Sequence, residues 1–215
     1  MEVHTQPWCR VDHRCSAGCL YSSNERSLVP HRILILASGA GTLTQAIIDA
    51  KELDIEIVAV ISDRSDAAVL VRAREAKIDC EVVAHEGSRA QWDSRIIERV
   101  GAYQPDLVVS AGFMKILPAD FVQRFPTINS HPALLPDFPG AHAVRDALNA
   151  QVGITGATVH WVDAGVDTGP IITSMQVPIV NGDTEEILHE RIKKVERALI
   201  VASISLILPT LETHV

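Results

Sequence analysis

From residue 31 onward, short runs of apolar residues alternate with longer amphipathic stretches. The runs are rich in Val, Ile and Leu and end in small or polar residues, as buried strands do. The stretches between them place apolar residues three and four apart, the spacing of a helix that packs one face on a core. The expected strands are RILILAS (32–38), IEIVAVISD (55–63), CEVVAH (80–85), PDLVVSAG (105–112) and TINSH (127–131), and the expected helices lie in GAGTLTQAIIDAKEL (39–53), AAVLVRAREAK (67–77), SRAQWDSRIIERVGAY (88–103, capped by Ser88) and PADFVQRF (118–125).

Strands that alternate with helices predict a parallel sheet covered by helices on both faces. Residues 154–179 differ, because they form two strand patterns joined by a link too short for a helical crossover, so we expect an antiparallel pair. A long closing helix is predicted over residues 183–208, with Asp183 or Thr184 as its cap. The expected fold is a single α/β domain over residues 31–215, a mostly parallel twisted sheet that is Rossmann-like in its first half and has an antiparallel strand in its second half.

Composition and charge argue against two classes of partner, nucleic acids and membranes. The chain has 215 residues, of which 47% are hydrophobic and 21% charged, and its net charge is −8 at pH 7. This acidic balance does not supply the basic face that non-specific nucleic-acid binding needs, so no nucleic-acid partner is expected. No apolar run approaches the roughly 18 residues of a membrane-spanning helix, so no membrane partner is expected either.

Residues 1–30 do not continue the strand and helix pattern. They hold Cys9, Cys15 and Cys19 with His13, a set that is suggestive of a metal clip but matches no standard zinc spacing, so no metal is expected. They contain no apolar core of a secretory signal. We interpret them as a flexible leader, and Cys80, the one cysteine in the rest of the chain, suits a reducing cytoplasm.

The first glycine-rich turn, SGAGTLTQA, lies between the first strand and the first helix. Gly39 and Gly41 let the chain turn tightly and let a ligand approach the backbone. The N–H groups of Gly41, Thr42 and Leu43 open the helix and therefore predict a phosphate site. A tight turn without a ligand and a dinucleotide site remain alternatives, although the third glycine of the dinucleotide pattern is Thr44 here, and Asp63 would be the ribose-binding acid.

Two further segments follow predicted strands. In AGFMKILP the residues Phe113, Met114, Ile116 and Leu117 are too apolar for a solvent loop, so the segment is either core or a wall for a flat organic ligand. In NSHP the side chains of Asn129 and His131 are two apart in a strand and share one face. An amide N–H can donate to an oxyanion and an imidazole can move a proton near neutral pH, which indicates catalysis.

The loop DAGVDTGPI supplies two carboxylates, Asp163 and Asp167. If the sheet brings this loop to the strand ends, one of them can orient His131. The alternative is turn chemistry, because Asp and Gly favour turns without any catalytic role.

In this order and spacing, SGAGTLTQAIIDA, AGFMKILP, NSHPALLPDFPGAHA and ATVHWVDAGVDTGPII resemble the phosphoribosylglycinamide formyltransferases, over about residues 31–208. The resemblance implies transfer of the formyl group of 10-formyltetrahydrofolate, a co-substrate, to the amine of a glycinamide ribonucleotide in purine synthesis, with no metal required. It also implies the formyltransferase fold, a cytoplasmic enzyme and two small-molecule partners, and it leaves a homodimer open.

The resemblance also assigns roles to residues. It implies a catalytic trio of Asn129, His131 and Asp167, with His142 and Thr158 as supports, Thr158 for Asp167. It implies nucleotide binding by Gly41, Thr42, Leu43 and Glu196. It implies folate contacts from Arg89, Met114, Lys115, Ile116, Leu117 and Asn129, and a pterin cradle of Asp163, Ala164, Gly165 and Val166. Because a carboxylate favours a charged ring, Asp167 is expected to raise the pKa of His131 above its reference of about 6.5.

The sequence departs from the resembled pattern at three places. Thr42-Leu43 replaces a common Ser-Asn, which keeps backbone contacts but loses a side-chain amide. Lys115 stands where arginine is usual, so a bidentate hold on the folate tail becomes a point charge. The chain ends at LETHV, short of the terminal segment of many relatives, and a different last sheet edge is expected.

Two rival functions stay open. Relatives that hydrolyse formyltetrahydrofolate share the Asn-His-Asp trio and are the first rival, although they carry an N-terminal regulatory domain. Relatives that formylate methionyl-tRNA share the trio too but are set aside, because they carry a further C-terminal domain and want a basic face. A non-catalytic dinucleotide-binding module is the rival from another class, and NAD binding without formyl chemistry would identify it.

Overall fold

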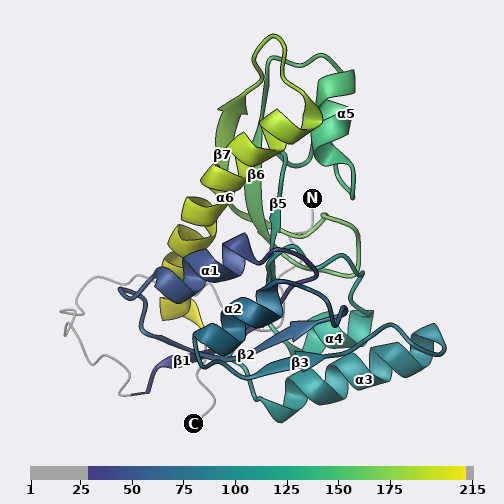
Figure 1. The fold of residues 1–215 in the computed structure, drawn as a ribbon, viewed down its shortest axis with the longest axis vertical. Helices are drawn as coiled ribbons and strands as arrows, with labels where there is room; N and C mark the ends of the chain where they lie inside the picture. Colours follow the sequence, from purple (N-terminus) through teal and green to yellow (C-terminus); the bar gives the residue numbers. More distant parts are fainter. Residues whose placement is uncertain (1–28, 212–215) are drawn as a thin grey trace, which may run out of the picture.

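The structure, a computed structural model, describes residues 29–211. It contains one seven-stranded sheet in the order β3-β2-β1-β4-β5-β6-β7 (Figure 1). The elements are β1 (His31–Leu36), α1 (Thr42–Asp49), β2 (Ile55–Ser62), α2 (Val69–Glu75), β3 (Cys80–Val82), α3 (Arg89–Ala102), β4 (Leu107–Ser110), α4 (Ala119–Arg124), β5 (Thr127–His131), α5 (Ala143–Asn149), β6 (Ile154–Trp161), β7 (Ile171–Pro178), α6 (Glu185–Ile207) and the 3-10 helix η1 (Leu208–Thr210).

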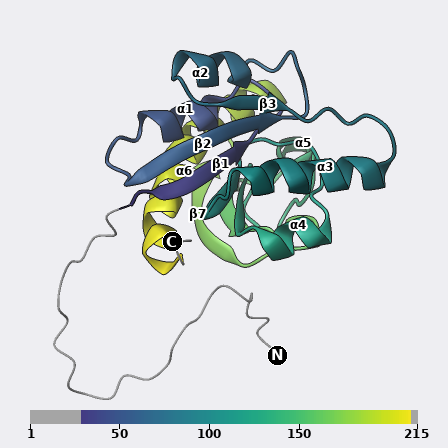
Figure 2. The ribbon, with the colours of Figure 1, turned by 90° about the horizontal axis from the view of Figure 1, so that it is seen from below.

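The parallel part of the sheet is buried on both faces, as its continuous apolar strands predict. In β1, Ile33 and Ile35 point into a core shared with α1, α2 and α6, whereas Leu34 and Leu36 point into a second core shared with α3 and α4. Figure 2 shows these helices on opposite sides of the sheet. Strands β2 and β4 pair with β1 in parallel, so the turns that follow them meet at one edge of the sheet.

The second half of the sheet is antiparallel, which confirms the expectation for residues 154–179. Strand β6 pairs with β5 so that His160 lies opposite Asn129 and Thr158 lies opposite His131. Strand β7 pairs antiparallel with β6 and is the last strand of the sheet. Because directly opposed residues share a face, this register adds β6 side chains to the Asn129–His131 face.

The predicted caps of two helices are present in the structure. Ser88 caps α3 in a reciprocal capping box with Gln91, and Thr184 caps α6. Helix α5 was not anticipated, because no element was predicted between residues 131 and 154. Among the helices within residues 29–211, none is long and apolar enough to cross a bilayer.

Candidate active site

A cavity of about 900 Å³ opens where the strands of the parallel half end. It is lined by the β1–α1 turn, the segment after β4, the end of β5, the β6–β7 loop and one face of α6. A second hollow, of about 580 Å³, lies between α1, α2 and β2 and holds none of the predicted site residues. The lining of the larger cavity includes most of those residues, namely Gly41, Thr42, Leu43, Met114, Lys115, Ile116, Leu117, Asn129, His131, Asp163, Gly165, Val166, Asp167 and Glu196.

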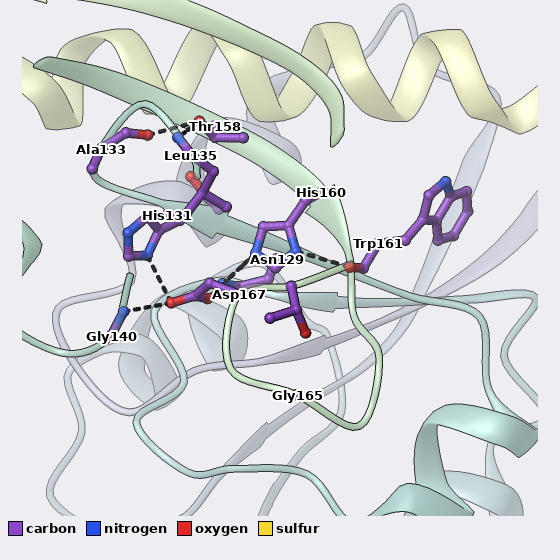
Figure 3. A network of polar contacts seen from close by, with 12 residues as sticks. Asn129, His131, Ala133, Leu135, Gly140, Thr158, His160, Trp161, Gly165 and Asp167 are labelled. Atoms are coloured by element: carbon purple, nitrogen blue, oxygen red, sulfur yellow. Dashed lines mark hydrogen bonds and ion pairs between the residues drawn. The ribbon is translucent and has the colours of Figure 1, made fainter. Parts of the chain in front are cut away.

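The structure brings Asn129, His131 and Asp167 together (Figure 3). Asp167 Oδ2 lies 3.3 Å from His131 Nδ1 and accepts a hydrogen bond from the Gly140 N–H at 2.8 Å. His131 Nε2 lies 2.8 Å from the Phe138 carbonyl oxygen. Asp167 has a φ of 55°, a left-handed conformation that Asp tolerates better than most residues with a side chain.

Both nitrogens of His131 thus face an oxygen that accepts hydrogen bonds. A neutral ring has one N–H, so either tautomer leaves one lone pair against an oxygen. A protonated ring donates to both. These two contacts therefore favour the protonated ring.

His160 is a member of this network that the sequence analysis did not assign. Its Nδ1 donates to the Trp161 carbonyl at 2.8 Å, which leaves Nε2 to accept from the Asn129 amide at 3.3 Å. The same Nε2 lies 3.4 Å from Asp167 Oδ1. The signal was available, because the alternation of Thr158 and His160 places both on one face of a strand expected to lie near the catalytic loop.

The predicted direction of the His131 shift is wrong. Burial lowers the pKa of His131 below its ordinary 6.5, and Asp167 and the Phe138 carbonyl oppose this without overcoming it. The side chain of His131 is only 4% exposed, which explains why the loss of hydration dominates. Burial alone would also raise the pKa of Asp167, but the contacts of that carboxylate with His160, the Gly140 N–H and His131 outweigh it and the pKa is lowered. Asp167 is therefore charged and His131 neutral at pH 7.

The predicted supports lie elsewhere than expected. Thr158 does not contact Asp167 in the network: its hydroxyl donates to the Ala133 carbonyl at 2.7 Å and accepts from the Leu135 N–H at 3.1 Å. It thereby fastens the loop that presents Phe138 and Gly140 to the two catalytic candidates. His142 is exposed at the N-cap of α5 and makes no capping hydrogen bond.

The β1–α1 turn has the geometry of an anion site. Gly41 is the N-cap of α1 with a φ of 71°, and a Cβ at this position would lie 2.5 Å from Val69 Cγ2. Glycine is therefore required both by the backbone conformation and by the contact with α2. The first N–H groups of α1 have no partner within the helix and open toward the cavity.

Helix α6 faces this turn across the cavity. It contributes the side chains His189, Lys193 and Glu196, spaced four and three residues apart on one helix face. Glu196 is buried and accepts a hydrogen bond from the Ser130 hydroxyl at 2.8 Å, and burial raises its pKa. The sequence analysis assigned only Glu196, although the helical spacing of His189 and Lys193 relative to it was visible.

The segment after β4 forms an apolar wall with two exposed side chains, Met114 (64%) and Ile116 (58%). The Met114 N–H donates to the Ser38 hydroxyl at 2.9 Å, which fixes the segment to the end of β1. Arg89 does not line the cavity, and its guanidinium donates to the Ile116 carbonyl at 2.8 Å. Lys115 lies 3.6 Å from Asp63 Oδ2.

On the side of the cavity opposite the apolar wall, the side chain of Asp163 holds the turn of the loop after β6. Its Oδ1 accepts from the Gly165 N–H at 3.0 Å and from the Thr168 hydroxyl at 2.7 Å. Gly165 and Val166 line the cavity and Ala164 does not. The turn-chemistry alternative therefore describes Asp163, whereas Asp167 belongs to the histidine network.

Within residues 29–211, no group of three or more His, Cys, Asp or Glu side chains is arranged to hold a metal ion. The cysteine cluster at Cys9, Cys15 and Cys19 lies outside the described residues.

Comparisons with known proteins agree on one family. The family model "Formyl transferase" matches residues 31–204. A phosphoribosylglycinamide formyltransferase of Mycobacterium tuberculosis is 50% identical over 191 residues, which cover 86% of this chain and 86% of that protein. The Escherichia coli protein of the same name is 38% identical over 174 residues, covering 78% and 82%. The crystal structure of glycinamide ribonucleotide transformylase 1 from Symbiobacterium toebii superposes with a TM-score of 0.79 at 41% identity, covering 88% and 91%.

Proposed function

The chain belongs to the formyl transferase family, and from its likeness to the phosphoribosylglycinamide formyltransferases we infer how its site works. It is a one-carbon transferase of purine biosynthesis. It passes the formyl group of 10-formyltetrahydrofolate to the amine of 5'-phosphoribosylglycinamide. Formyltetrahydrofolate hydrolysis and non-catalytic dinucleotide binding are not favoured by these comparisons.

One observation supports the chemistry most strongly, which is the contact of His131 with Asp167 beside the Asn129 amide. When the substrate amine attacks the formyl carbon, the oxygen of the formyl group gains negative charge. The nitrogen of the attacking amine becomes acidic at the same time. One N–H of Asn129 is taken up by His160, and the other is available to the oxyanion. The negative charge of Asp167 then stabilises whatever positive charge His131 acquires.

The proton transfers of this reaction can begin from a neutral His131. The ring accepts the proton that the attacking nitrogen loses at Nε2, in place of the contact of that nitrogen with the Phe138 carbonyl, and Nδ1 donates to Asp167. The same proton then passes to the departing folate nitrogen as the bond from that nitrogen to the formyl carbon breaks. The products are a formamide and tetrahydrofolate, and His131 returns to its neutral state.

Nucleotide binding is assigned to the cavity side between α1 and α6. The N–H groups of Gly41, Thr42 and Leu43 bind the phosphate at the start of α1, and Lys193 lines the same cavity as a positive charge. Glu196, fixed by Ser130, accepts hydrogen bonds from the ribose or glycinamide end.

Folate binding is assigned to the opposite side. The pterin lies between the wall of Met114, Ile116 and Leu117 and the loop from Asp163 to Val166, near Asn129. Lys115 takes a carboxylate of the glutamyl tail. Arg89 acts on this site through the wall, because it holds the Ile116 carbonyl.

The test is a spectroscopic assay of deformylation of a 10-formyl folate, with and without the glycinamide ribonucleotide. Turnover only in the presence of the nucleotide is expected. Turnover at the same rate without it would establish a hydrolase and contradict the proposal.

We also propose that residues 31–215 are the catalytic domain, that residues 1–30 are dispensable and that the enzyme is cytoplasmic. The family match begins at residue 31. A chain that starts at Pro30 is expected to turn over normally, and loss of activity in that chain would contradict the domain assignment.

A further inference from the structure

Each lysine or arginine that lines the cavity within residues 29–211 is held by a carboxylate. Arg64 pairs with Asp66 at 2.8 Å, Lys193 pairs with Glu190 at 2.7 Å, and Lys115 pairs with Asp63 at 3.6 Å. A substrate anion must therefore compete with a carboxylate of the protein for each of these charges.

The three carboxylates differ in exposure. The side chains of Asp66 and Glu190 are 70% and 60% exposed, so water screens these pairs and readily replaces them. The side chain of Asp63 is 5% exposed. Its Oδ1 is buried and has no hydrogen-bond partner among the described residues. A carboxylate that has lost most of its water depends on the nearby cation for compensation.

Lys115 reaches Asp63 from the opposite side of β1. The neighbouring residue, Met114, is fixed to the end of β1 through Ser38, and Asp63 directly follows β2. The Lys115 side chain is 37% exposed, so it remains accessible from the cavity while it contacts Asp63. Lys115 is thus shared between a fixed buried carboxylate and any anion in the cavity.

We propose that Asp63 is a specificity-determining residue that weakens the hold of Lys115 on the anionic glutamyl tail of the folate. The inference rests on the proposed function, which assigns the tail to Lys115. Asp63 acts through Lys115 and touches neither the formyl group nor the nucleotide. Its effect therefore belongs to the tail carboxylates and is absent for a folate that lacks them.

The decisive experiment measures, by calorimetry, the Kd of a non-transferable folate analogue with one glutamate and of the same analogue without its glutamate. Asp63→Asn keeps the shape and removes the charge, and it should strengthen binding of the glutamylated analogue by about fivefold, the scale of one charge pair. Binding of the analogue without glutamate should not change. Asp66→Asn is the matched control. It also removes one negative charge next to the site, but from the exposed pair with Arg64, in which Lys115 takes no part. It should change the Kd of neither analogue.

Unchanged or weaker binding of the glutamylated analogue by Asp63→Asn would overturn the proposal, and so would equal strengthening of both analogues. A second measurement applies even if Asp63→Asn does not fold. Lys115→Met should lower stability, because it leaves Asp63 buried and unpaired, and Asp63→Asn/Lys115→Met should recover it. No loss of stability in Lys115→Met would also overturn the proposal. The wild-type transfer assay is run first, so that failure of the proposed function is recognised separately.

Discussion

The two halves of the sheet supply different things to the site. The parallel half supplies backbone groups and an apolar wall, through the glycine turn after β1 and the segment after β4. The antiparallel half supplies amide, imidazole and carboxylate side chains that contact one another across β5, β6 and the following loop. The proposed binding elements in the first half are local to one strand and its turn. The proposed catalytic residues in the second half depend on strand register, because His160 and Thr158 lie opposite Asn129 and His131 only in the observed pairing.

The largest expected effect comes from breaking the antiparallel half at Asp167. Asp167→Asn keeps the shape but removes the charge that stabilises a protonated His131, so kcat should fall by about 10²–10³-fold. The Kd values of nucleotide and folate should change by less than about threefold, because the residue acts in the transition state. Asp137→Asn removes an exposed carboxylate from the neighbouring loop and should leave kcat unchanged. An equal loss in both variants would show that net charge, and not the histidine contact, is responsible.

In the parallel half, Gly41→Ala should raise the KM for the nucleotide by about tenfold with a smaller effect on folate. The substitution forces alanine into a left-handed conformation, a cost of about 1–2 kcal/mol, and drives its Cβ against Val69, so the phosphate turn is displaced. Gly153→Ala is the control, because nothing lies within 4 Å of its added Cβ and its φ is not positive. A nucleotide KM that does not move would remove the phosphate from this turn.

A smaller effect is expected from Thr158→Val, which deletes the hydroxyl that holds Ala133 and Leu135. Two buried backbone groups lose their partner, so the free energy of unfolding should fall by about 2 kcal/mol in urea titrations. Thr155 lies on the same strand, and its buried hydroxyl has no partner among the described residues. Thr155→Val should therefore cost little or nothing. A similar cost for both variants would mean that the loop contact contributes no stability of its own.

The smallest expected effect is on the pH dependence of kcat/KM. Because burial lowers the pKa of His131 below 6.5 and the neutral ring accepts the proton, kcat/KM should be flat above neutral pH and fall through an inflection below 6.5. Asp167 favours the charged ring, so Asp167→Asn should move the inflection of the residual activity to still lower pH. A kcat/KM that falls as the pH rises through the inflection would identify the protonated ring as the active form.

The contrast between the halves also explains what could be predicted from the sequence. The strand Thr127–His131, the Ser88 cap and the glycine turn at Gly41 depend on local patterns, and the structure has all three. The pKa direction of His131 was wrong, because sequence reveals the neighbouring carboxylate but not the extent of burial that outweighs it.

Contacts between distant segments account for the remaining differences. Three kinds of contact join different elements across the fold: those of Thr158 with Ala133 and Leu135, that of Arg89 with the Ile116 carbonyl and that of Lys115 with Asp63. His160 and Lys193 carried a periodic signal, but its meaning depended on which strand and helix would face the cavity.

The central claim is that His131 and Asp167 act as one unit, and a double-mutant cycle on kcat tests it most directly. His131→Ala and Asp167→Asn should each lower kcat by about 10²-fold or more, and the double variant should be little worse than the more damaging single one, because residues that act together are not additive. Multiplicative losses in the double variant would show that the two residues do separate jobs and would contradict the mechanism.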